Sequence, residues 1–230
     1  MSGSENQTGD DQVPAWARRT AGESRWWATA AMVVLLGLQF FLPDELTPGP
    51  RWVVPAIGFV LLVVLVIASP YRLDREEMRL RRVGLGLMGL LGFAMVWGVW
   101  HLVHGLIDGE VSNNAAGLLA AGAAVWLSNF LVFALWYWEF DRGGPAARAH
   151  ARKPYPDFLF VQMQNPDLAD PEWEPQFLDY LYLSFTNATA FSPTDVMPMS
   201  RWAKLTMMMQ SGISLITVSL VIARAVNVLK

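Results

Sequence analysis

The sequence contains no cysteine and little histidine. None of its 230 residues is Cys, and three are His. The lack of Cys excludes disulfide bonds, thiol nucleophiles and metal sites with Cys ligands. Charged residues make up 16% of the chain, and the formal net charge of −3 gives no basic surface of the kind that binds nucleic acid. The motifs G-x-S-x-G and H-E-x-x-H and a phosphate-binding glycine loop are also missing, so we expect no enzyme activity.

Hydrophobic residues, in contrast, make up 53% of the chain and gather in long uncharged runs. A helix of roughly 20 apolar residues crosses the hydrocarbon core of a bilayer. Five runs approach or exceed this length. They are Trp26–Leu42, Trp52–Ser69, Val83–Ile107, Ala115–Phe140 and Leu205–Leu229. We therefore expect an all-α polytopic membrane protein with five spans plus a short re-entrant or sixth helix before the last span.

The order of polar and apolar segments predicts four parts. Residues 1–25 form a disordered tail, and residues 26–140 form a four-helix transmembrane region. Residues 141–175 form a polar connecting segment with six prolines, which excludes a long regular helix. Residues 176–230 hold a short helix, a polar segment and the last transmembrane helix. The tail has no apolar core like that of a signal peptide, so we expect it to be retained.

The basic residues predict the orientation. Most of the 17 Lys and Arg residues lie in the tail, in the loop RLDREEMRLRR at residues 72–82 and in the connecting segment. These parts share one side of the membrane, which the positive-inside rule makes the cytoplasm. The excess of Arg over Lys suggests a GC-rich bacterial gene, so we expect a multi-pass protein of the bacterial plasma membrane. The side of the C-terminus depends on whether residues 176–191 cross the membrane or re-enter.

A polar stretch, FTNATAFSPTDVMP, separates the short apolar segment from the last helix. It has three interpretations: an outer turn after a sixth span, a structural re-entrant loop, or a re-entrant segment with a pore or binding role. Irregular backbone at membrane depth needs shelter from protein or water. Selectivity filters have this design.

The stretch DYLYLSFTNATAFSPTDVMP resembles the pore-loop region of potassium channels, which has an aromatic short helix, S-F-x-x-x-T, a filter, an Asp and a Pro. Ser184, Phe185, Thr189, Asp195 and Pro198 match this pattern. Where that family has Thr-Val-Gly-Tyr-Gly, this chain has Ala190–Thr194, without either glycine. The filter-like residues implied are Thr186, Asn187, Thr189, Ala190, Phe191, Ser192, Pro193, Thr194 and Asp195, and the pore-helix-like residues are Asp179, Tyr182, Ser184 and Phe185.

The chain also resembles uncharacterised bacterial membrane proteins of similar length. These have several spans, a basic loop after the second and a D-[YF]-L-Y-x-S-F segment before the last. Residues 179–185 of this chain match that segment. This resemblance implies an architecture and no activity.

On the last helix, Gln210, Ser214 and Thr217 recur at helical spacing. Such a polar face suits either the lining of a water-filled pore or packing between helices. The first hypothesis is a channel-like homo-oligomer that conducts a monovalent cation, tetrameric only by the channel resemblance. The alternative is a non-conducting structural or partner-binding membrane protein.

His101 and His104 lie three residues apart and share a helix face. With Asp108 they could bind Zn²⁺ or Cu²⁺. Polar capping at the membrane interface and a role in proton transfer are the other interpretations. A metal site here would make the chain a metal-binding membrane protein.

Overall fold

The computed structural model of the chain describes residues 13–68, 78–108, 115–189 and 195–228, and most of these are helical. Three helices are long and apolar enough to cross a membrane: α3 (Met78–Asp108), α4 (Ala115–Phe140) and α8 (Arg201–Val228). The helices α1 (Trp26–Phe41) and α2 (Val53–Ala68) are apolar but have 16 residues each. At 1.5 Å per residue each is about 24 Å long, less than the usual hydrocarbon core. The structure thus supports three of the five predicted spans by length and composition.

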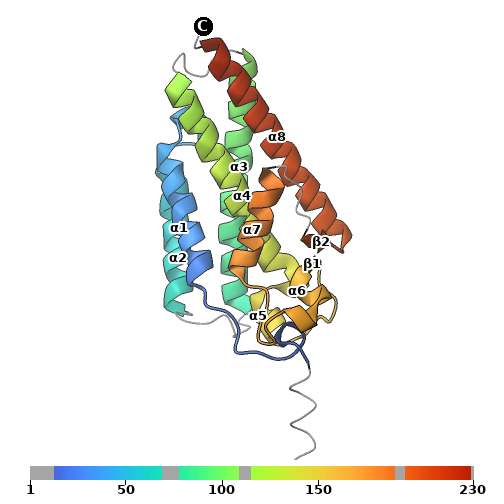
Figure 1. Cartoon of the computed structure of the whole chain (residues 1–230). Coiled ribbons are helices and arrows are strands. Elements are labelled where there is room, and N and C mark those ends of the chain that lie inside the picture. The colour runs from blue at the N-terminus through green and yellow to red at the C-terminus, as the bar shows by residue number, and fades with distance from the viewer. Residues whose placement is uncertain (1–12, 69–77, 109–114, 190–194, 229–230) are drawn as a thin grey trace, which may run out of the picture.

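The central helix of the bundle is α4, which packs against α1, α3, α7 (Phe177–Ala188) and α8 (Figure 1). Apolar side chains cover nearly every side of α4, so it has no face that must meet water. Phe133, Leu135 and Tyr137 of α4 are fully or almost fully buried in the main core. Small residues bring the helices close together: Gly122 of α4 lies directly against Val221 of α8.

The short helix α7 runs antiparallel to α4 and parallel to α8. Along α7, Phe177 contacts Trp138 of α4 and Ser184 contacts Phe130, so residue numbers rise in α7 as they fall in α4. Ser184 contacts Gln210 of α8 and Ala188 contacts Ser214, so residue numbers rise together in α7 and α8. After α7, the strand β2 (Val196–Pro198) pairs antiparallel with β1 (Phe158–Phe160) beside the end of α4. The chain therefore returns to the end of the bundle where α7 begins, and α8 starts there (Figure 1). The helices α7 and α8 therefore begin at the same end of the bundle.

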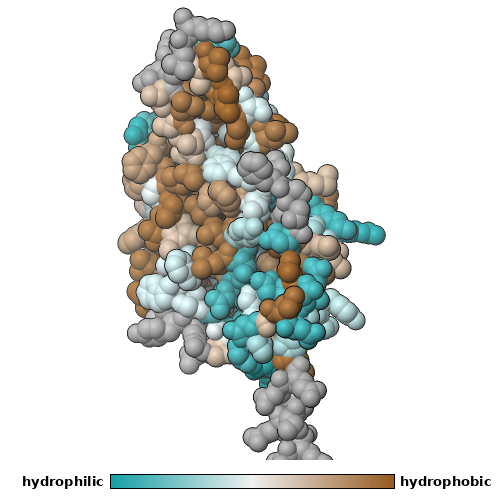
Figure 2. Space-filling model, in the orientation of Figure 1, coloured by the Kyte–Doolittle hydropathy of each residue, from teal (hydrophilic) through white to brown (hydrophobic). Residues whose placement is uncertain are grey.

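One end of the bundle carries most of the polar structure. It is formed by residues 13–25 and 141–176, together called the polar end below. Its elements are η1 (Ala15–Ala17), η3 (Asp141–Gly143), α5 (Pro145–Ala149), β1, α6 (Val161–Gln164) and η4 (Pro166–Leu168). Hydrophilic side chains gather here and hydrophobic ones cover much of the helical bundle (Figure 2). The turn η2 (Asp44–Leu46) joins α1 to α2 at the other end.

The N-terminal segment is part of the polar end. The backbone N–H of Ala15 donates to Pro171 O at 3.0 Å, and that of Thr20 donates to Ala149 O at 2.9 Å. Arg25, just before α1, donates from its guanidinium to Leu65 O near the end of α2. Unpaired carbonyls at a helix C-terminus favour such a cation. The prediction of a disordered tail over residues 1–25 is thus wrong for residues 13–25, while residues 1–12 lie outside the described part.

Candidate functional site

Two networks of hydrogen bonds hold α7, one at each end of the helix. The inner network surrounds Asn187 and Gln210 between α4, α7 and α8. The entry network surrounds Glu23 at the polar end, where α7 begins. Burying polar groups inside an apolar bundle costs free energy, so such groups usually mark positions important for packing or function. We therefore treat the two networks and the helix between them as the candidate site.

Gln210 is the centre of the inner network and is fully buried. Its Nε2 donates to Ser184 O at 2.9 Å and to Ser184 Oγ at 2.6 Å. Its Oε1 accepts from the Tyr137 hydroxyl and from Asn187 Nδ2, each at 2.7 Å. An amide side chain has two donor hydrogens and two acceptor lone pairs. All four are used, so this amide has no free capacity for an ion or a water molecule.

The inner network extends along α8 toward the end of α7. Ser211 Oγ lies 3.0 Å from Asn187 Oδ1, and Asn187 Nδ2 also donates to Met207 O at 3.0 Å. Ser214 Oγ donates to Ala188 O and accepts from Trp126 Nε1 at 2.8 Å. The last turn of α7 has unpaired carbonyls, as every helix end does. Serines of α8 therefore cap the inner end of α7.

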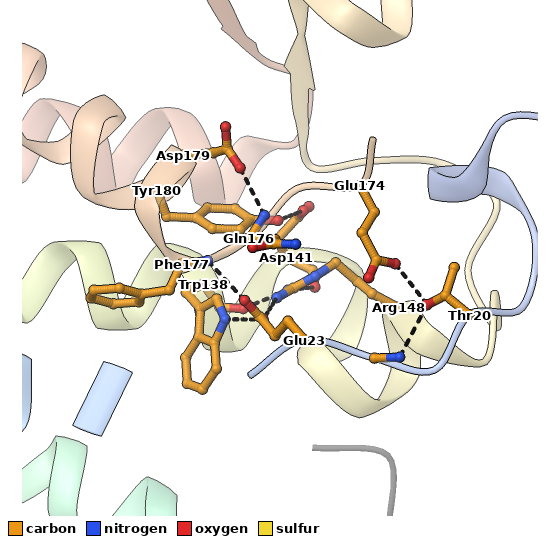
Figure 3. A network of polar contacts seen from close by, with 11 residues as sticks. Thr20, Glu23, Trp138, Asp141, Arg148, Glu174, Gln176, Phe177, Asp179 and Tyr180 are labelled. Atoms are coloured by element: carbon orange, nitrogen blue, oxygen red, sulfur yellow. Dashed lines mark hydrogen bonds and ion pairs between the residues drawn. The ribbon is translucent and has the colours of Figure 1, made fainter. Parts of the chain in front are cut away.

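The carboxylate of Glu23 organises the entry network, which Figure 3 shows. Its Oε2 accepts from the backbone N–H of Phe177, the first residue of α7, at 2.8 Å. Its Oε1 accepts from Trp138 Nε1 and, at 3.1 Å, from the Arg148 guanidinium. A helix N-terminus has unpaired N–H groups and a partial positive charge, and both favour a carboxylate. Glu23 thus ties the N-terminal segment to α4, α5 and α7 together.

Arg148 and Asp141 complete the entry network. The Arg148 guanidinium donates to Trp138 O and Asp141 O and lies 5.0 Å from the centre of the Tyr180 ring. Asp141 Oδ2 accepts from the Tyr180 hydroxyl, and Oδ1 accepts from the backbone N–H of Asp157 at 2.9 Å. Asp157 Oδ1 in turn accepts from Trp202 Nε1 at 2.8 Å. The start of α8 is therefore connected to the same network as the start of α7.

Burial raises the pKa of the Glu23 carboxyl above its ordinary value. The Arg148 charge and the hydrogen bonds from Trp138 and Phe177 act in the opposite direction. The loss of hydration is the larger effect, because the side chain is buried with only 7% of its surface exposed. Glu23 is therefore the acidic group of the entry network whose protonation is most directly coupled to the start of α7.

Three of the described filter-like residues, Thr186, Asn187 and Thr189, form hydrogen bonds within the chain. Thr186 donates from its hydroxyl to Tyr182 O and Leu183 O, both 3.0 Å away, in its own helix. Thr189 donates to Thr186 O at 2.9 Å. Asp195 is half-buried just before β2. Five filter-like residues lie outside the described residues: Ala190, Phe191, Ser192, Pro193 and Thr194.

Some of the pore-helix-like residues lie on the buried face of α7 and others lie on its exposed face. Asp179 accepts from the backbone N–H of Gln176 at 2.8 Å and caps the helix start. Ser184 is buried and donates to Phe130 O at 2.6 Å. Tyr182 and Phe185 are exposed at the outer face, where Phe185 makes edge-on ring contacts with α4.

The residues expected to line a pore, Gln210, Ser214 and Thr217, are each at most 2% exposed. Gln210 and Ser214 face α4 and α7 of the same chain. Thr217 Oγ1 is buried without a hydrogen-bond partner among the described residues. Large apolar residues dominate the exposed side of α8, among them Leu205, Met208, Leu215 and Ile222. Of the two interpretations of this polar face, the geometry favours packing between helices.

His101 and His104 each direct Nδ1 at the backbone carbonyl four residues earlier, at 3.0 and 2.9 Å. The His101 ring stacks on Trp97, and the His104 ring packs at a tilt against Trp100. The contact with the carbonyl makes Nδ1 the protonated nitrogen and leaves Nε2 as the one able to accept a bond. In the part of the chain that the structure describes, no group of three or more His, Asp or Glu residues is placed to hold a metal ion. The side chain of Asp108 lies outside that part.

The sequence did not point to the entry network. In the sequence, Glu23 is one acidic residue in a polar tail, and Arg148 is one of the basic residues of the connecting segment. Two signals were available: a charged pair, Asp141 and Arg142, directly after an apolar span, and an indole near the end of that span. Comparison of the chain with protein-family models, curated proteins and solved structures found no match.

Proposed function

We propose that this chain is a non-conducting, multi-pass protein of the bacterial plasma membrane that acts as a structural or partner-binding subunit. Five helices cross the bilayer in this proposal, with α1 and α2 as the shorter pair, and the N-terminus is cytoplasmic. The re-entrant helix α7 then has a structural role: it fixes α4 and α8 relative to each other and to the polar end.

The observation that carries the proposal is the saturation of Gln210. A pore wall needs polar groups that can exchange partners with ions or water. All four hydrogen-bonding positions of Gln210 are taken by Ser184, Tyr137 and Asn187. The side of α8 that is open to other molecules exposes mainly apolar side chains, which favours contact with lipid or with another apolar helix.

A channel-like homo-oligomer is the second candidate, and one observation favours it. The helix α7 is antiparallel to α4 and parallel to α8, and the chain returns to the same end between α7 and α8. The resemblance to potassium channels implies this order of outer helix, half-depth helix and inner helix. In this candidate a monovalent cation would pass near residues 190–195.

Ion flux in liposomes tests the two candidates against each other. The full chain is reconstituted into potassium-loaded vesicles, and efflux is compared among wild type, Asp195→Lys and protein-free vesicles. The proposal expects equal, background efflux from all three. Efflux that exceeds background for wild type and falls for Asp195→Lys would overturn the proposal and establish the channel. Asp44→Lys, in the turn between α1 and α2, controls for a non-specific effect of the charge change.

A further inference from the structure

The first turn of α8 carries two exposed basic residues, Arg201 and Lys204. They are three residues apart and so share one face of the helix. Neither forms an ion pair with another residue that the structure describes. Asp157 accepts hydrogen bonds from Trp202 Nε1 and from the backbone N–H of Arg142. Asp195 is half-buried before β2 and forms no ion pair with either cation. This surface therefore presents positive charge.

The same face of α8 becomes apolar immediately after the two cations. Leu205 is 65% exposed and Met208 is 70% exposed. Exposed apolar side chains continue to Val226. At 1.5 Å per residue, Leu205 to Val226 extends about 33 Å, close to the roughly 30 Å of a hydrocarbon core. Arg201 then lies about one turn outside the hydrocarbon and Lys204 directly at its edge, where its long side chain reaches the depth of the lipid phosphates.

Two methionines extend the surface on the side of the sheet. Met197 of β2 points away from the protein core and is 51% exposed, whereas its neighbours Val196 and Pro198 are buried and half-buried. Met199 follows and is 55% exposed. Long apolar side chains beside two cations at the polar end match the mixed chemistry of a lipid, with an anionic headgroup and acyl chains.

We propose that Arg201 and Lys204 form a binding site for an anionic phospholipid, with the phosphate between the two cations and an acyl chain along Leu205 and Met208. This site is independent of whether the protein conducts ions. The bound lipid would hold the start of α8, and with it β2, at the membrane interface. The occupant is a lipid and not a soluble phosphate, because the apolar part of the site continues directly from the charged part.

Native mass spectrometry of the purified full-length protein tests the proposal, with phosphatidylglycerol as the probe and phosphatidylcholine as the zwitterionic comparison. We expect Arg201→Gln/Lys204→Gln to bind phosphatidylglycerol about 30-fold more weakly than wild type, from the usual contribution of two basic residues at an anionic surface. The variant Arg79→Gln/Arg82→Gln loses the same two charges from the start of α3 and should bind like wild type. Both pairs are exposed, and unchanged circular dichroism verifies the fold.

Three results would overturn the site. Equal weakening in both double variants would show a general effect of basic charge. Equal binding of phosphatidylcholine would remove the role of the anionic headgroup. Displacement of the lipid by an equal concentration of glycerol 3-phosphate would make the ligand a soluble phosphate. Met208→Asn adds a further test, since it should weaken the lipid and leave any binding of glycerol 3-phosphate unchanged.

Discussion

Glu23 accepts a hydrogen bond at 2.8 Å from the backbone N–H of Phe177, which lies 154 residues later in the chain. This bond connects the N-terminal segment to the first residue of α7. The same carboxylate accepts from Trp138 at the end of α4 and pairs with Arg148 of α5. The position of α7 therefore depends on residues that lie outside the long helices, and five predictions follow from this arrangement and from the packing beside it.

Glu23→Ala should destabilise the fold strongly. The substitution removes the acceptor of Phe177 and Trp138 and leaves the buried Arg148 without its ion-pair partner. An unpaired buried charge of this kind costs about 3–5 kcal/mol. Unfolding by sodium dodecyl sulfate in mixed micelles measures the change. The control is Glu172→Ala, whose ion pair with Arg18 is exposed and should contribute at most about 1 kcal/mol. Equal effects of both substitutions would contradict the role assigned to Glu23.

The stability contributed by Glu23 should fall as the pH rises. Burial raises its pKa above the ordinary value of 4.5, so the folded state holds the proton more tightly than the unfolded state. The contribution is then fully present below about 4.5 and is lost as the pH rises through the folded-state value. Glu23→Gln removes this titration and keeps the shape. The stability of wild type relative to Glu23→Gln should decrease with rising pH, and an increase would show that the Arg148 charge outweighs burial.

Gln210→Ala should separate α7 from α8. It removes the acceptor of the buried Tyr137 hydroxyl and one hydrogen-bond partner each of buried Ser184 and Asn187, which keep Phe130 O and Met207 O. Each unsatisfied buried group costs about 1–3 kcal/mol in water-soluble proteins and less between membrane helices, so we expect a loss of about 2–4 kcal/mol. Ser219→Ala, on the exposed side of the same helix, should stay within about 0.5 kcal/mol. A loss below 1 kcal/mol for Gln210→Ala would mean that water replaces the amide and that this region is hydrated.

Gly122→Ala should weaken the contact of α4 with α8. A Cβ atom at this position would lie 2.7 Å from Val221 Cγ2, closer than such atoms approach. Overpacking of this kind costs about 1–3 kcal/mol. Val221→Ala in the same chain should recover most of the loss, as a double-mutant cycle can measure. Gly86→Ala, with no neighbour within 4 Å, should be neutral or stabilising through helix propensity.

A disulfide can test the return of the chain before α8. Leu159 and Met197 are directly paired in the β1–β2 ladder, and the chain has no natural Cys. Cysteines at these two positions should form a disulfide on mild oxidation, because the Cα atoms of directly paired antiparallel residues lie about 4.5–5.5 Å apart, within the range that a disulfide spans. Full crossing of residues 176–191 would place the two positions on opposite sides of the membrane. The pair Leu159→Cys and Ile222→Cys, with position 222 toward the far end of α8, should form no disulfide.

The sequence by itself determined the long helices, because an uninterrupted apolar run has few alternatives to a helix in a bilayer. The predicted fourth span, Ala115–Phe140, has the same bounds as α4. The tertiary structure decided which way the polar side of α8 faces. Helical spacing groups Gln210, Ser214 and Thr217 on one face, but only the position of α4 and α7 determines whether protein or water covers that face. The roles of Glu23, Arg148 and the β1–β2 pair depended on tertiary structure too, since each joins segments far apart in the chain and local sequence carries no record of such partners.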